Sequence, residues 1–417
     1  MRMKWMAALC LTCATIAGAS GLRVDDSGRY FDENGKPWFW LGDTAWPLAV
    51  TYTAQEANDY LKARARLGFS IVQVSLIWDG GTGTEKGASP NPNFAGVVPW
   101  QNRDPLKPEE AYWKNVDTLV ANAAREHLYL GLLPAWGSYV VNEKLITAAN
   151  AEQYGKWLGT RYKNAPNIVW ILGGDRKVSQ APDIWPLIAR GLQAGNGGAH
   201  LITFHPGMER KASSESLRNE PWLAANMIQT WANYTDIPEI VRHVYELKPA
   251  KPVILGEGAY EEGPEYPTKP ITPLVVRKQA YWAYLSGGSF TYGHNDMWRK
   301  NPNWRKSLTS EGARDMSVLK KIFAKVDWWK LVPDNSVLGD GPGTDKEQNA
   351  AARASDGSWV LVYLSHNAPV NLRLAQYKTA EWINPQDGNR VRISQPGAES
   401  HIPPLSWQDA VLLATEN

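Results

Sequence analysis

The chain has 417 residues, of which 43% are hydrophobic and 21% are charged, so it can form one large globular domain and a smaller one. Lys and Arg number 44 and Asp and Glu number 42, which gives a formal net charge of +2, and no long basic run occurs. This balance argues against nucleic acid or an anionic membrane as a partner. The 21 tryptophans favour a saccharide partner, because aromatic faces stack on sugar rings.

Residues 1–20 have the pattern of a secretory signal peptide, in which Arg2 and Lys4 precede a short apolar run and then small residues. The run is too short to span a bilayer core of about 30 Å. Both cysteines, Cys10 and Cys13, lie in this segment, so its removal leaves no cysteine. We therefore expect a secreted or periplasmic bacterial protein without disulfides and without a membrane contact.

The segment after the signal predicts the entry into a barrel. A polar turn between aromatic pairs predicts a β-hairpin within 21–37, and the apolar stretch Trp38–Asp43 predicts the first barrel strand. Thr53 and Glu56 have the spacing of a capping box, which predicts a helix from there to about Leu67.

Strand-like and helix-like segments then alternate up to residue 327, a pattern typical of a (β/α)8 TIM barrel over residues 21–327. The further strands are expected at 69–78, 128–133, 168–173, 201–205, 226–229, 252–257 and 288–292, and the further helices at 108–126, 151–162, 182–192, 237–247, 273–285 and 310–323. A long excursion rich in Gly, Asn and Pro follows the second strand over 79–108, and we expect it on the catalytic rim.

The pattern changes at Trp328. From there to residue 417 short alternating strands are separated by Asp-Gly turns, for example 359–364, 370–374 and 380–383. Residues 328–417 therefore predict a small all-β sandwich domain beside the barrel.

Two acids stand at the ends of buried strands. The run Ile168–Gly173 leads through Gly174 to Asp175, and the run from Pro252 leads through a glycine to Glu257. Strands four and seven of a barrel face each other across its opening, and active sites gather at the carboxyl ends of the strands. Two facing carboxylates suggest glycoside hydrolysis. By analogy with the many retaining sugar hydrolases that place their acid and nucleophile on these strands, Asp175 is the expected general acid/base and Glu257 the expected nucleophile.

Other residues at strand ends are candidate ligands of the sugar hydroxyls. Asp43 has the same Gly-acid context on the first strand, and we interpret it as a hydroxyl ligand, whereas Glu261 is left open as an alternative nucleophile. The further polar candidates are Arg176, His205, Gln229, Tyr260, His294 and Asp296. Several tryptophans follow or end strands, and at least two of them should form sugar platforms; they are Trp46, Trp78, Trp136, Trp231 and Trp298.

Other chemistries lack their motifs. No His-x-His or His-Glu-x-x-His occurs, and the seven histidines are scattered, so no metal is expected. No Gly-x-Ser-x-Gly nucleophile elbow and no Gly-rich phosphate loop in the required context are found, so no cofactor is expected.

Three stretches together resemble the apiosidase-like family of bacterial barrel glycoside hydrolases: WFWLGDTAW at 38–46, the strand 170–175, and GEGAYE at 256–261. The similarity covers about residues 22–325, and the tail resembles a small β domain that has been labelled collagen-binding. The resemblance implies a retaining, exo-acting enzyme that removes apiose from branched pectin, with the family's catalytic aspartate and glutamate matching Asp175 and Glu257. The aspartate stands in Gly-Gly-Asp, whereas the larger clan of retaining barrels has Asn-Glu.

The leading hypothesis is therefore an exported glycoside hydrolase that acts on pectic side chains of the plant cell wall. A non-catalytic protein for polysaccharide binding or matrix adhesion is the second hypothesis, and a lyase or transglycosidase on the same barrel is the third.

Overall fold

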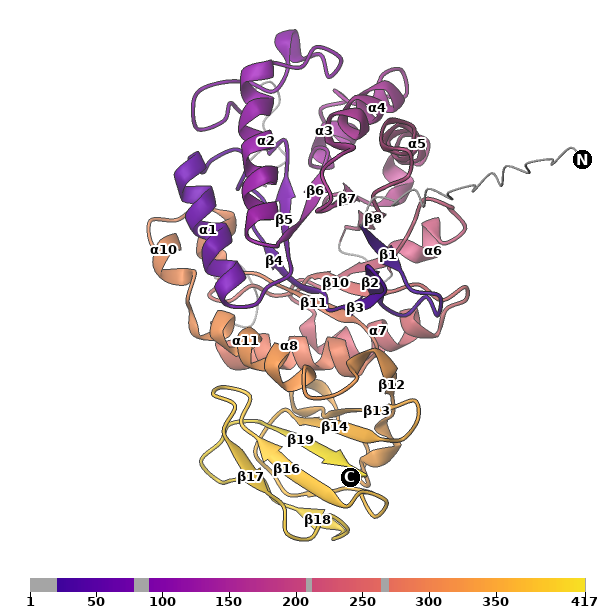
Figure 1. Ribbon diagram of the computed structural model, residues 1–417, viewed down its shortest axis with the longest axis vertical. Helices are drawn as coiled ribbons and strands as arrows, with labels where there is room; N and C mark the ends of the chain where they lie inside the picture. Colours follow the sequence, from indigo (N-terminus) through magenta and orange to yellow (C-terminus); the bar gives the residue numbers. More distant parts are fainter. Residues whose placement is uncertain (1–20, 79–89, 208–211, 264–269, 417) are drawn as a thin grey trace, which may run out of the picture.

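A computed structural model describes residues 21–78, 90–207, 212–263 and 270–416 (Figure 1). The predicted signal peptide lies outside the described residues. Residues 79–89, the first part of the predicted rim excursion, also lie outside them. Within the described part, no helix is both long and apolar enough to cross a bilayer.

Eight of the described strands form one parallel sheet that curves into a barrel, in the order β8-β7-β6-β5-β4-β11-β10-β9. They are β4 (Leu41–Thr44), β5 (Ile71–Ser75), β6 (Tyr129–Leu133), β7 (Ile168–Gly173), β8 (Ile202–His205), β9 (Asn226–Gln229), β10 (Val253–Glu257) and β11 (Ser289–Tyr292). The seam between β8 and β9 is bridged by two hydrogen bonds, from the Ala224 N–H to the Ile202 carbonyl and from the Thr203 hydroxyl to the Ala225 carbonyl, each 2.8 Å long. The predicted TIM barrel is confirmed.

Helices cover the outside of the barrel. The long ones are α1 (Ala54–Arg66), α2 (Glu110–Arg125), α4 (Ala151–Tyr162), α5 (Ile184–Asn196), α7 (Ile237–Glu246), α8 (Pro273–Leu285) and α11 (Glu311–Phe323). Short ones are α3 (Ser138–Val141), α6 (Ser213–Leu217), α9 (Asn295–Trp298) and α10 (Trp304–Ser307), with single 3-10 turns η1 (Gln101–Arg103), η2 (Val178–Gln180), η3 (Tyr234–Asp236), η4 (Trp328–Lys330), η5 (Asn335–Val337) and η6 (Asp345–Glu347). The capping box that starts α1 is confirmed: Thr53 and Glu56 each accept the other's backbone N–H.

The amino-terminal strands form a separate three-stranded sheet, with β1 (Leu22–Val24), β2 (Phe31–Glu33) and β3 (Lys36–Trp38). The sequence predicts one strand over Trp38–Asp43, but the structure divides it, because Trp38 pairs with Phe31 in this sheet and the barrel strand begins only at Leu41. The apolar and aromatic residues of this run suit both β3 and β4, so the sequence pattern could not show where one strand ends and the next begins. The sheet covers the amino end of the barrel, where Tyr129 donates to Glu33 at 2.6 Å.

The C-terminal part is all β, as predicted. Its described strands form a six-stranded antiparallel sheet, β12-β13-β14-β19-β16-β17, and a two-stranded ribbon, β15-β18. Their bounds are β12 (Leu331–Pro333), β13 (Ala350–Ala354), β14 (Trp359–Leu364), β15 (Val370–Asn371), β16 (Thr379–Ile383), β17 (Arg390–Arg392), β18 (Ser400–His401) and β19 (Ala410–Thr415). Alternate residues of β14 face opposite sides: Trp359, Leu361 and Tyr363 join the core of the barrel, and the residues between them join a second core with the ribbon.

Candidate active site

A cavity of about 700 Å³ opens at the carboxyl ends of the barrel strands. This volume lies in the range of pockets that enclose a small organic ligand, about 300 to 1,000 Å³. The cavity is lined by Trp46, Trp78, Trp136, Asn142, Asp175, Arg176, Lys177, Gln180, Gly207, Gln229, Trp231, Glu257, Tyr260, Trp298 and Arg299. It therefore contains both acids that the sequence singles out.

Asp175 reaches the cavity through a strained turn at the end of β7. Gly173 and Gly174 have φ values of 88° and 99°, and Asp175 itself has a φ of 53°. The φ of Gly174 favours glycine, and a Cβ there would lie 3.0 Å from the Trp136 ring, which is a tight contact. Left-handed residues other than glycine cost free energy, and such strain is typical of functional sites. The Gln229 amide donates to Asp175 Oδ1 at 2.8 Å and fixes the carboxylate.

Glu257 is directed into the cavity by an irregularity in β10. Leu255 pairs with Ile228 but Glu257 pairs with Gln229, so the register shifts at Gly256. Such a bulge changes the direction of the side chain that follows it. Glu257 is buried, and its Oε2 lies 3.1 Å from Nε2 of His205.

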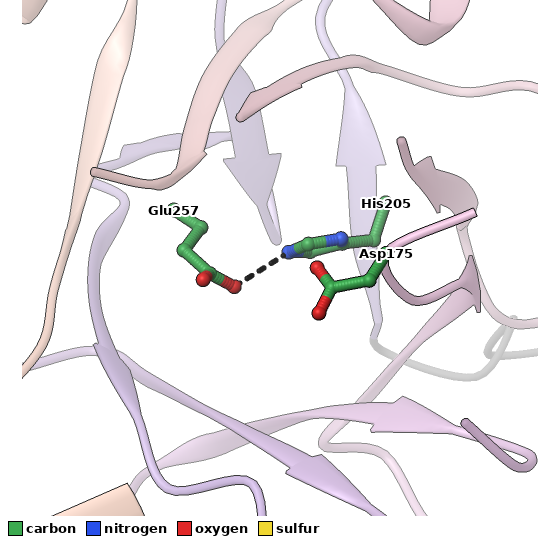
Figure 2. Close-up of side chains that lie close together, drawn as sticks. All are labelled: Asp175, His205 and Glu257. Atoms are coloured by element: carbon green, nitrogen blue, oxygen red, sulfur yellow. Dashed lines mark hydrogen bonds and ion pairs between the residues drawn. The ribbon is translucent and has the colours of Figure 1, made fainter. Parts of the chain in front are cut away.

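His205 lies beside both carboxylates and makes a hydrogen bond to Glu257 (Figure 2). Its Nδ1 lies 3.0 Å from the Pro206 carbonyl oxygen, which can only accept, so Nδ1 carries a proton. Nε2 can then donate to an ionised Glu257 when the ring is doubly protonated. Burial lowers the pKa of His205, but its hydrogen bond and charge interaction with Glu257 outweigh this effect, and the pKa lies above its ordinary value.

The two carboxylates are close together. One oxygen of Asp175, one oxygen of Glu257 and a ring nitrogen of His205 all lie within 4.8 Å of one another. Although Asp175 is exposed to the cavity, protein surrounds its carboxylate, and this desolvation raises its pKa to about 6; the charge of Glu257 adds to the increase, and His205, Gln229 and Arg176 oppose it. A carboxyl group with this pKa can give and take a proton near neutral pH.

Aromatic rings form a large part of the cavity lining. Trp136 packs edge-on against Trp46 and Trp78, with centroid distances of 5.0 and 4.7 Å, and the Trp46 indole N–H donates to the Tyr260 hydroxyl at 3.0 Å. All four of these rings are at most 4% exposed. The half-buried Trp231 and Trp298 are therefore better placed than these four to offer a ring face to a sugar.

Basic side chains lie at the edge of the cavity. Arg176 donates to Asn142 Oδ1 and to the Asp175 carbonyl, both at 2.9 Å. Lys177 follows it, and the guanidinium of Arg299 lies over the Trp298 ring at 4.3 Å from its centroid. Apart from the two catalytic candidates, the charged residues that line the cavity in the described part of the chain are thus all cationic.

The structure corrects the interpretation of Asp43. This residue is fully buried and lies outside the cavity, where Arg64 of α1 pairs with its Oδ2 at 2.9 Å and Tyr60 donates to the same oxygen. Its side chain points from β4 toward the helix layer, because alternate residues of a barrel strand face opposite sides. Asp43 is a buried ion-pair partner and not a ligand of substrate hydroxyls.

Four further candidates are also absent from the cavity lining: His205, which contacts Glu257 from a fully buried position, and Glu261, His294 and Asp296. Glu261 is buried outside the cavity and accepts hydrogen bonds from Tyr292, Ser310 and the Gly312 N–H, so its carboxylate joins β11 to the start of α11 and the role of alternative nucleophile is wrong. His294 is buried and accepts the N–H of Asp296, whose carboxylate accepts from Asn301 and Ser307. His294 caps α9, and the carboxylate of Asp296 connects α9 to the residues that follow it, so neither side chain lines the pocket.

Several lining residues were missed by the sequence reasoning: Asn142, Lys177, Gln180, Gly207 and Arg299. Lys177 and Arg299 directly follow the predicted residues Arg176 and Trp298, so the signal that could have found them is their position next to predicted site residues. Asn142 and Gln180 come from short helical turns after β6 and β7, for which the sequence carries no signal of orientation.

Two groups in the described part bring three possible metal ligands together: Asp175 with His205 and Glu257, and Glu262 with His294 and Asp296. Glycoside hydrolysis by two carboxylates does not require a metal.

Comparisons with known proteins agree with this geometry. Residues 25–330 match the family described as "Apiosidase-like, catalytic domain", and residues 332–415 match the "Putative collagen-binding domain of a collagenase". No curated protein matches the sequence.

The solved structures that resemble the chain include a glycoside hydrolase family 5 protein from Bacteroides vulgatus, which is 25% identical over 95% of this chain and 94% of its own, with a TM-score of 0.86. Another, described as a glycoside hydrolase, is 26% identical over 96% of this chain and 97% of its own, with a TM-score of 0.82. Since the first family match spans most of the chain and the cavity holds the paired carboxylates, the chain belongs to the apiosidase-like family and is a glycoside hydrolase.

Proposed function

We propose that this glycoside hydrolase retains the anomeric configuration, with Glu257 as nucleophile and Asp175 as general acid/base. The carboxylate spacing carries the proposal. Retaining enzymes have carboxyl groups about 5 to 5.5 Å apart, whereas inverting enzymes need about 6.5 to 9.5 Å to admit a water between them. Oxygens of the two groups within 4.8 Å of each other favour the first arrangement.

In the first step Glu257 attacks the anomeric carbon, and the bond from that carbon to the leaving oxygen breaks. Asp175 gives its proton to this oxygen, so the leaving group departs as an alcohol and the sugar becomes an ester of Glu257. Protonated His205 donates to Glu257 at 3.1 Å, which keeps the free carboxylate ionised before the attack.

In the second step water attacks the same carbon, and ionised Asp175 takes its proton. The ester bond breaks, Glu257 regains its negative charge and Asp175 is again protonated, which closes the cycle. The pKa of about 6 suits Asp175 to both proton transfers, because neither form is strongly disfavoured near neutral pH.

We further propose that the substrate is a side chain of an acidic, pectic polysaccharide and that apiose is the sugar released. The cationic lining residues Arg176, Lys177 and Arg299 support an anionic substrate, because they would attract its carboxylates. Apiose itself is supported by the membership of the apiosidase-like family.

Exo action is part of the proposal, and the size of the product tests it. A smaller hollow of about 460 Å³ adjoins the cavity and shares Trp78, Trp298 and Arg299 with it. Release of the single terminal sugar would support exo action. The hollow has room for further sugar units, so release of a longer fragment would show endo action instead.

The mechanism is tested by following the anomeric signals of the first product by proton NMR, with apiosides and a panel of aryl glycosides and pectic oligosaccharides as substrates. The initial product should have the anomeric configuration of the substrate. An initially inverted product would refute retention, and an unsaturated product would show a lyase.

Export is proposed from the signal-like pattern of residues 1–20. Expression of the full chain in a bacterial host should give a shortened protein outside the cytoplasm, with its new amino terminus near residue 21. An intact amino terminus on cytoplasmic protein would contradict export.

A further inference from the structure

Helix α8 lies between the barrel and the C-terminal β domain (Figure 1). Every residue from Val276 to Leu285 is buried. A helix that is buried all round must be packed on both sides. Here α8 contacts β11 and the segment after β10 in the barrel, and β13 and β14 in the β domain.

The β domain holds this helix by a buried network of charges. Arg277 of α8 makes two hydrogen bonds of 2.9 Å to the carboxylate of Asp409, which directly precedes β19, and a third of 2.7 Å to Asp315. The Tyr363 hydroxyl donates to the same Asp409 at 2.8 Å, and its ring stacks on Tyr281 of α8 with centroids 4.5 Å apart. A two-point contact between a guanidinium and a carboxylate fixes orientation as well as distance.

The opposite side of α8 holds the backbone that follows Glu257. Gln279 is fully buried; its Oε1 accepts the Ala259 N–H at 2.7 Å and its Nε2 donates to the Ala259 carbonyl at 3.0 Å. A Cβ on Gly258 would lie 2.4 Å from that Oε1, so the close approach depends on glycine. Only Gly258 separates the nucleophile from the clamped residue Ala259.

We propose that the C-terminal β domain is a positioning element of the active site, which fixes α8 through Asp409 and Arg277 and thereby fixes Glu257 through Gln279. The contacts are continuous from one domain to the nucleophile. A misplacement of 1 Å in a reacting group costs about 100-fold in rate, so even a small displacement of α8 is expected to lower turnover. The catalytic part of the inference rests on the proposed function.

The test compares Asp409→Asn, Gln279→Leu and the double variant in the full-length chain. Asp409→Asn should lower kcat about tenfold with little change in KM, since a few tenths of an ångström suffice for this loss. The loss of kcat in the double variant should be smaller than the two single losses combined, because both changes interrupt the same series of contacts from the β domain to Glu257. Should Asp409→Asn fail to fold, Tyr363→Phe removes only one hydroxyl from the network, and it should lower kcat two- to threefold by the same reasoning.

A matched control is Glu381→Gln, which breaks the 2.6 Å ion pair with Arg390 at the edge strand of the same domain. It should leave kcat at the parental value. If Asp409→Asn and Gln279→Leu lower the unfolding temperature and leave kcat unchanged, the β domain only stabilises the barrel and the proposal is overturned.

A second readout needs no substrate. His205 Nε2 lies 3.1 Å from Glu257, so displacement of Glu257 should lower the titration midpoint of the His205 ring, measured by NMR in the parent and in Asp409→Asn. An unchanged midpoint would contradict positioning. If the parent protein released no sugar from any substrate, the proposed function would be refuted. The titration midpoint of His205 would still show whether the β domain positions Glu257.

Discussion

Replacing Asp175 by Asn should remove the descending limb of the pH–rate profile. Asp175 must be protonated to expel the leaving group, and its pKa is raised to about 6. The parent should therefore keep about nine tenths of its maximal kcat/KM at pH 5, about half at pH 6 and about a tenth at pH 7, with a tenfold loss per further unit. Asn has no proton to lose, so the variant should show no such limb.

The loss of rate should depend on the leaving group. General acid catalysis contributes about 10²- to 10⁴-fold, and a sugar alcohol needs all of it because its oxygen is a poor leaving group. An activated aryl glycoside, whose phenolate leaves without a proton, should lose far less in the first step. Its glycosyl-enzyme should then accumulate, because the base of the second step is also missing, and added azide should release it as a glycosyl azide.

The assay is kcat/KM from pH 4 to 9 on one pectic oligosaccharide and one activated aryl glycoside, with circular dichroism to confirm the fold at each pH. The reasoning is refuted if Asp175→Asn keeps a descending limb near pH 6, because another group, with His205 the nearest, would then be the titrating acid. Equal losses on both substrates would also contradict the assignment of Asp175 as the acid.

Three further predictions concern the nucleophile, the strained turn and the buried ion pair. Glu257→Gln should fold like the parent and lose at least about 10³-fold in kcat on every substrate, since no covalent ester can form; parental rates on an aryl glycoside would sink the assignment. Gly174→Ala, at a φ of 99° with a Cβ 3.0 Å from Trp136, should destabilise the protein by about 1–3 kcal/mol in urea unfolding and lower kcat, and an unchanged midpoint would show that the turn relaxes. Asp43→Ala leaves the buried Arg64 without its partner and should cost about 3–5 kcal/mol of stability, whereas a loss confined to substrate affinity would restore Asp43 as a ligand.

The sequence by itself determined the repeated elements of the barrel and the two acids that face its cavity. The capping residues Thr53 and Glu56 define the start of α1 within one residue, and the Pro that opens the helix Pro273–Leu285 defines its start. These features are local: hydrogen bonds and apolar periodicity within a few residues decide them, so they can be read from the chain without knowing its neighbours.

Only the tertiary structure distinguished Asp43 from Glu257, although each follows a glycine at the end of a barrel strand. A strand's side chains alternate between two faces, so one residue of register decides whether an acid meets the cavity or the helix layer. The shift at Gly256 turns Glu257 inward, while Asp43 in the regular strand β4 turns outward to Arg64. That shift is set by pairing with β9, which precedes β10 but is separated from it by α7, so the residues of β10 alone do not reveal it.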